Sequence, residues 1–119
     1  MATVKPAVSN LNDDSVLIVW AGMSQTNSDA EACNSLSQYD DRSVQITGDF
    51  GTTGNIALHG SNDNTNYVIL NDPLGNLINF GVTGLKQVLE YTRSVKPVLS
   101  TPDGSTNLTV TMIAKRKRI

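Results

Sequence analysis

Two pairs of adjacent carboxylates, at residues 13–14 and 40–41, are the first candidates for acid–base chemistry in this sequence. Adjacent side chains on an extended chain point in opposite directions, so neither pair forms an acid–base couple. The one cysteine, Cys33, and the one histidine, His59, lie in no recognisable nucleophile motif. The sequence also lacks nucleotide-binding loops, serine elbows and zinc-ligand spacings. We therefore expect a protein that is not an enzyme.

Three loops rich in asparagine and aspartate, at residues 62–66, 71–76 and 103–107, carry the oxygen ligands that calcium prefers. None of them has the spacing of an EF-hand. Asn and Asp side chains also form turns by accepting hydrogen bonds from nearby backbone amides, which explains the same composition. A single cysteine rules out a thiolate cluster and an intramolecular disulfide. We expect turns at these loops and no metal or other cofactor.

The strongest charge feature is the basic run Lys115, Arg116, Lys117 and Arg118 near the C-terminus. It holds four of the nine basic residues, whereas the preceding chain carries five basic and eleven acidic residues. Such a run suits an acidic protein surface, a nucleic acid or a solvated chain end. Three Tyr, two Phe and one Trp are a thin set for stacking bases, which disfavours nucleic acid. An acidic protein partner is the reading we favour, with a solvated end as the alternative.

The rest of the chain has the pattern of short strands separated by turns. Residues 43–50 and 107–114 alternate apolar and polar side chains, and threonine on the polar face is typical of a pleated surface. In the second segment, Leu108, Val110, Met112 and Ala114 are the residues expected to face inward.

The spacing of the turns predicts two hairpins and one helical turn. Residues 43–50 and 55–59 form the first predicted hairpin, and residues 67–70 and 77–80 form the second. Apolar residues at helical spacing, Leu85, Val88 and Leu89, predict a turn or two of helix just after Gly84.

Many short strands in a chain of 119 residues predict one domain with one core. The predicted fold is all-β: a two-sheet β-sandwich, jelly-roll-like, with at most one or two short helical turns. We divide it into an N-terminal arm (1–14), the sandwich (15–114) and a basic C-terminal tail (115–119). No apolar run is long enough to span a bilayer, and the first six residues lack a signal-peptide core. We therefore expect a protein made in a cytoplasm, with no membrane partner.

Two stretches depart from this regular pattern. Residues 15–21 are apolar on both faces, as expected either for a central strand covered by the N-terminal segment or for a strand that meets a second chain. In the second case Leu17, Val19 and Trp20 lie in a protein interface and the chain forms a homo-oligomer. Residues 23–41 are polar and too long for a simple connection, which indicates a functional or disordered loop.

Residues 41–51, followed by residues 58–67, resemble small head proteins of tailed bacteriophages. The resemblance covers roughly residues 40–115 and is to the cement, or decoration, proteins on the outside of short-tailed phage capsids. It extends to residues 72–75, 85–90 and 103–110. It implies a jelly-roll-like sandwich without catalytic residues that self-associates, with a dimer favoured. It also implies that the protein staples neighbouring subunits of the major capsid protein at the outer surface of the virion.

We therefore expect a structural capsid decoration protein that stabilises the assembled head against the pressure of its DNA. The alternative is a carbohydrate-binding β-sandwich module displayed on a virion for host adhesion, because the turn at residues 60–63 followed by an aromatic residue also occurs in such modules. That alternative requires an exposed aromatic platform. The candidates for it are Trp20, Tyr39, Tyr67 and Tyr91.

Overall fold

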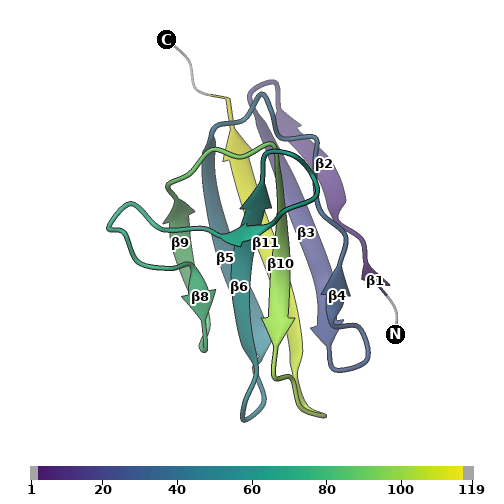
Figure 1. Cartoon of the computed structure of the whole chain (residues 1–119). Helices are drawn as coiled ribbons and strands as arrows, with labels where there is room; N and C mark the ends of the chain where they lie inside the picture. The colour runs from purple at the N-terminus through teal and green to yellow at the C-terminus, as the bar shows by residue number, and fades with distance from the viewer. Residues whose placement is uncertain (1–2, 117–119) are drawn as a thin grey trace.

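The computed structural model describes residues 3–116 and consists of two antiparallel β-sheets packed face to face (Figure 1). The first sheet has five strands in the order β2 (Ala7–Asn12), β3 (Ser15–Ser24), β11 (Asn107–Lys115), β5 (Asp41–Asp49) and β9 (Gly84–Val88). In the second, β6 (Asn55–Ser61) pairs with β10 (Ser94–Ser100), β7 (Val68–Ile69) and β8 (Asn79–Phe80). A short parallel pair, β1 (Thr3–Val4) and β4 (Asp29–Ala30), lies beside them. None of the described residues is helical, so none forms a helix that could cross a membrane.

The chain alternates between the sheets in the order of a jelly roll. It passes from β5 in the first sheet to β6–β8 in the second, returns for β9, crosses for β10 and ends with β11 beside β5. Successive side chains of a strand face opposite ways, so every second residue points into the space between the sheets. The core fills that space, and the four inward residues expected in β11 are all buried in it. The predicted fold class is confirmed.

The first predicted hairpin is wrong. β5 pairs with β11 and β9, and β6 pairs with β10, so the connection at residues 50–54 crosses from one sheet to the other. Both strands have one apolar face, and packing those faces together buries Val44 and Ile46 in the same core as Ile56 and Leu58. Edge-to-edge pairing of the two strands would not achieve that burial.

The second predicted hairpin is present only at its tip, residues 70–78, because β7 and β8 each pair with β6 and not with each other. An antiparallel bridge joins Asn71 to Leu77, and the amide of Ile78 donates to the carbonyl of Leu70 at 2.9 Å.

The predicted helical turn at Leu85, Val88 and Leu89 is also wrong, because residues 84–88 form β9. Val88 is buried opposite Arg42 of β5, whereas Leu85 and Leu89 are exposed. Pairing with β5 supplies the backbone hydrogen bonds of this segment. Sheet pairing thus overrides a helical spacing that rested on three residues.

The boundaries expected at residues 15 and 115 do not coincide with the edges of the sheet. In the described part of the segment expected to be an arm, β1 pairs with β4, and β2 is the edge strand beside β3. At the other end, β11 includes Lys115, and the amide of Arg116 donates to the carbonyl of Asp14 at 2.6 Å. Residues 117–119 of the expected basic tail lie outside the described residues.

The long polar connection between β3 and β5 is ordered by a few buried contacts. Ala30, Cys33 and Leu36 join the core. Cys33 pairs with Val95 and so extends the second sheet beyond β10. The indole Nε1 of Trp20 donates to the carbonyl of Glu31 at 2.8 Å.

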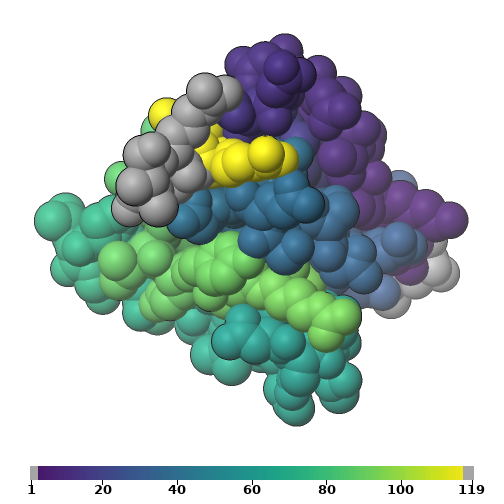
Figure 2. All heavy atoms as spheres, turned by 90° about the horizontal axis from the view of Figure 1, so that it is seen from above, coloured from purple at the N-terminus to yellow at the C-terminus, as the bar shows by residue number. Residues whose placement is uncertain are grey.

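The guanidinium of Arg42 fixes the end of this connection. Arg42 is 1% exposed. Its Nη2 donates to the carbonyls of Leu36 (3.0 Å) and Thr92 (2.7 Å), and its Nε donates to the carbonyl of Tyr39 (2.8 Å). The guanidinium also lies over the Tyr91 ring, 5.0 Å from its centroid, and burial lowers the pKa of Arg42. Seen from above, the blue connection lies between the yellow end of β11 and the green segment before β10 (Figure 2).

Replacing Arg42 by Met should lower the free energy of unfolding by about 3 kcal/mol or more, because three buried carbonyls lose a charged donor. In a domain of this size the melting temperature should fall by roughly 10 °C or more, measured by circular dichroism. Arg93→Met, at an exposed arginine, is the matched control and should change stability by about 0.5 kcal/mol or less. Equal melting temperatures for the Arg42 variant and the wild type would contradict this account.

At the opposite end of the sandwich, Asp103 joins two loops. Its carboxylate accepts hydrogen bonds from the amide of Thr52 at 2.7 Å, in the β5–β6 crossing, and from the amide of Ser105 at 3.0 Å. The crossing turns through Gly51, whose φ of 67° is left-handed and whose position leaves no space for a side chain beside Asp103. The hydrogen bond from the Thr52 amide is the largest cause that lowers the pKa of Asp103 to about 2.

The folded protein should therefore lose stability in acid partly through Asp103. Since the pKa of its folded form lies below the ordinary value of 3.8, the unfolded chain takes up the proton first. The stabilisation is complete above about pH 4 and is lost as the pH falls towards about 2. Thermal melts should show a shallower loss of melting temperature over that range for Asp103→Asn than for the wild type. Parallel pH profiles for the two proteins would refute the assignment.

Candidate functional site

The residues that first suggested acid–base or nucleophilic chemistry are not brought together. Cys33 is buried and shares a row with Val95 and Gly60, so the next residue along β6, His59, faces the other side of the second sheet. Burial, and to a smaller degree the charge of Lys96, lowers the pKa of His59. Within residues 3–116, no group of three His, Cys, Asp or Glu side chains is placed to hold a metal ion.

The Asn- and Asp-rich loops are turns closed by their own aspartates. Asp63 accepts hydrogen bonds from the amides of Thr65 (2.9 Å) and Asn66 (2.8 Å), and from the hydroxyl of Ser61 (2.8 Å). The backbone hydrogen bond from Asn66 is the largest cause that lowers the pKa of Asp63. These carboxylate oxygens thus bind N–H and O–H groups of their own loop, which accounts for the composition of the loop.

The five-stranded sheet has an outer face on the side away from β6 and β10. Two complete rows of side chains cross it, each with one residue from every strand. The rows are Ser9, Leu17, Ile113, Ser43 and Gln87, and next to it Ala7, Val19, Thr111, Gln45 and Leu85. None of these residues is charged, although the chain holds nine basic and eleven acidic residues. We call these two rows the uncharged face.

Two of the three predicted interface residues of β3 lie on the uncharged face. Leu17 and Val19 are half-buried there, between β2 and β11. Trp20 does not belong with them. It is fully buried in the core, because residues 19 and 20 of a strand point to opposite sides of the sheet. Its prediction as an interface residue is corrected.

The described part of the basic run lies at one end of the uncharged face. Lys115 is exposed and pairs in register with Asp41 of β5. Arg116 turns towards the long connection, where its guanidinium donates to Gln38 at 2.7 Å and lies 5.8 Å from the centre of the Tyr39 ring. Lys117 and Arg118 fall outside the described residues.

The aromatic side chains form no common platform. Trp20 is buried, Tyr67 lies under Lys96 and hydrogen-bonds Ser94, and Tyr91 lies under Arg42 with its hydroxyl donating to the carbonyl of Ser37. Tyr39 packs against the core. All the aromatic residues of the sequence fall within residues 3–116, so this description covers every candidate for the glycan-binding alternative.

Sequence reasoning missed two apolar residues of the uncharged face, Ile113 and Leu85. Ile113 occupies an outward position of β11, between inward Met112 and Ala114, and an apolar side chain where the other outward residues of the strand are Thr109 and Thr111 is a usable signal. Leu85 was assigned to a helix, and the pairing of β9 with β5 places it at the edge of the same face.

The chain matches no family model. It matches no curated protein. Among solved structures, it is similar to the crystal structure of SPBc2 prophage-derived protein YomS. The match has a TM-score of 0.61 and 13% sequence identity, and covers 91% of this chain and 98% of the other. At that identity the similarity shows a shared fold, and it extends over nearly the whole of both chains.

Proposed function

We propose that this protein is a structural phage protein that decorates the outside of the assembled head. It would bind neighbouring subunits of the major capsid protein and hold them together against the pressure of the packaged DNA. The observation that carries its self-associating part is the uncharged face, a sheet surface suited to contact with a second copy of the chain. The fold shared with a prophage-derived protein supports a phage origin, and the sequence resemblance to decoration proteins supports the location on the head.

The composition of the uncharged face favours burial in a protein contact. Leu17, Val19, Ile113 and Leu85 lie on it among threonine, serine, glutamine and alanine. The solvated face of a sheet carries polar side chains, whereas the centres of protein interfaces are depleted of charged ones. We assign this face to self-association of the protein, with a dimer as the favoured form.

A decoration protein of this kind would act by mass action. Binding to the expanded, assembled lattice and not to free subunits stabilises the assembled state, by an amount that grows with the logarithm of the free protein concentration once the sites are nearly filled. A dimer with two attachment points needs only modest affinity at each, because the second contact forms at a high effective concentration. A rigid sandwich is suited to this role, since little conformational entropy is lost on docking.

The direct test is co-sedimentation with empty, expanded particles of the phage that encodes the protein. The wild type should pellet with the particles and remain in the supernatant with unassembled capsid subunits. Equal binding to free subunits, or no binding to particles, would contradict the proposal.

The basic run should contribute electrostatically to the same binding. Changing residues 115–118 to Gln should weaken binding by one to two orders of magnitude at low ionic strength, and the difference should fade near molar salt. Binding of the wild type to bare DNA at physiological salt would instead favour the nucleic-acid interpretation.

Self-association through the uncharged face predicts that Leu17→Asp and Val19→Asp behave alike. Both side chains lie on that face, so each substitution should weaken the oligomer at least about tenfold and leave the melting temperature close to that of the monomeric domain. Sedimentation velocity over a range of concentrations measures the change. Val68→Asp, at an exposed residue of β7, is the control and should leave the oligomer intact. A wild type that stays monomeric at high micromolar concentration would disprove this assignment.

A further inference from the structure

The exposed apolar side chains are concentrated in one part of the described chain. Seven of the ten large hydrophobic residues exposed within residues 3–116 fall between residues 68 and 91: Val68, Leu74, Leu77, Val82, Leu85, Leu89 and Tyr91. Single apolar residues scattered over a surface are ordinary, and Leu85 of this group belongs to the uncharged face. Two of the others, Leu74 and Leu77, share the loop between β7 and β8.

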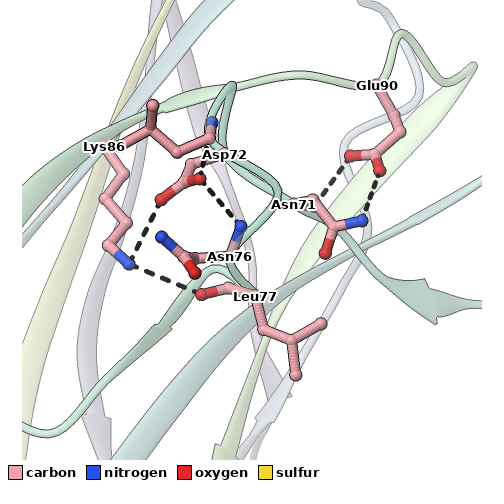
Figure 3. A network of polar contacts seen from close by, with 7 residues as sticks. Asn71, Asp72, Asn76, Leu77, Lys86 and Glu90 are labelled. Carbon is pink, nitrogen blue, oxygen red and sulfur yellow. Dashed lines mark hydrogen bonds and ion pairs between the residues drawn. The ribbon is translucent and has the colours of Figure 1, made fainter.

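The most exposed of them is Leu74, at the tip of the loop between β7 and β8, which we call the apolar loop (residues 71–77). Leu74 is 87% exposed. The loop projects beyond β9 at the left of Figure 1, and it forms the projection at the left of Figure 2. Its backbone is closed by Asp72, whose carboxylate accepts hydrogen bonds from the amides of Leu74 and Asn76, both at 3.0 Å (Figure 3). The backbone hydrogen bond from Asn76 is the largest cause that lowers the pKa of Asp72.

The apolar loop is also anchored to β9 and to the segment that follows it. Lys86 of β9 pairs with the carboxylate of Asp72 at 3.5 Å and reaches the carbonyl of Leu77 at the same distance (Figure 3). Glu90 accepts hydrogen bonds from the backbone amide of Asn71 at 2.7 Å and from its side-chain amide at 3.0 Å. Because both ends are held, Leu74 is presented in water with little ordering left to lose on binding.

A hollow beside the loop indicates the chemistry of the partner. Pro73 and Leu89 line it together with Asp40, Asp41 and Gln87, and its volume is about 330 Å³. Val88 also lines it, and both aspartates are exposed, so the hollow is mainly polar and negatively charged, with Pro73 and Leu89 at its border. A complementary surface would offer an apolar socket for Leu74 and a lysine or arginine side chain towards the two carboxylates. The same carboxylates would repel the anionic surface of a membrane.

We propose that the apolar loop and this hollow form the site that attaches the protein to a folded protein partner with an apolar socket rimmed by basic side chains. This inference rests on the proposed function, under which the partner is the major capsid protein. The apolar loop then binds the capsid lattice, and the uncharged face, which meets the hollow at Gln87, contacts a second copy of the chain. Leu74 is the anchor, and Lys86 is a positioning residue that acts through Asp72.

The experiment compares wild type, Leu74→Ser and the matched control Leu11→Ser in co-sedimentation with expanded particles. Leu11 is also exposed, on β2 at the opposite edge of the first sheet. Leu74→Ser should bind at least about tenfold more weakly, whereas Leu11→Ser should bind like the wild type. Melting temperatures of both variants should match that of the wild type, because neither side chain is in the core.

Two further variants test the positioning and the charge. Lys86→Met should weaken binding by about three- to tenfold although Leu74 is unchanged, because the loop must then be ordered on docking. Asp41→Asn should weaken binding about threefold at low ionic strength, with no difference near molar salt.

The outcomes separate this inference from the proposed function. If the wild type binds particles and Leu74→Ser binds equally well, the attachment site is wrong and the decoration role stands. If Leu74→Ser changes the sedimentation of the free protein, the loop contacts a second copy of the chain, and the inference names the wrong partner. If the wild type does not bind particles at all, both fail.

Discussion

The burial of one cation, the guanidinium of Arg42, determines how the two sheets and the long connection fit together. Its hydrogen bonds go to backbone carbonyls at residues 36, 39 and 92, which belong to segments far apart in the sequence. A buried charge is costly unless its donors are satisfied, so the carbonyls must be held in place for the fold to be stable. This requirement orders the connection before β5 and the segment before β10 at the same time. It also places Tyr91 and Thr92 against the first sheet. The neighbouring residue Glu90 is thereby positioned to anchor the apolar loop.

The parts of this fold that sequence reasoning predicted well are those with a regular period. The alternation in β5 and β11 identified their inward residues and the all-β class, because a period of two residues is a direct consequence of strand geometry. Which strands pair is a different question, since a turn of similar length can return a chain within a sheet or carry it across. The β5–β6 connection illustrates this, because only packing of the two apolar faces decides for the crossing. Arg42 shows the other limit: it lies on the same strand face as Val44 and Ile46, but nothing in the sequence identifies the distant carbonyl of Thr92 that accepts from its guanidinium.

Periodicity also explains why only part of the candidate site could be predicted. Leu17 and Val19 were found because an apolar run exceeds what one buried face requires, and the structure places both on the uncharged face. Trp20 was included with them, although adjacent residues of a strand point to opposite sides of the sheet, which assigns Trp20 to the core. The apolar loop could not be found by periodicity, because its two exposed leucines, Leu74 and Leu77, lie in a turn with neither a strand nor a helix period. Its anchoring depends on Lys86 and Glu90, which come close to it only through the pairing of β9 with β5.

The bulge in β2 has a consequence for the protein in solution. β2 is the free edge of the first sheet, all six of its residues are exposed, and none is charged. Such an edge is a template on which further strands can add, and chains often block it with a lysine or a proline. Here the regular pairing of β2 with β3 breaks between Asn10 and Asn12, and Pro6 precedes the strand. An incoming strand would therefore find an undistorted ladder over only four residues, residues 7–10, so the irregularity shortens the edge that is open to strand addition.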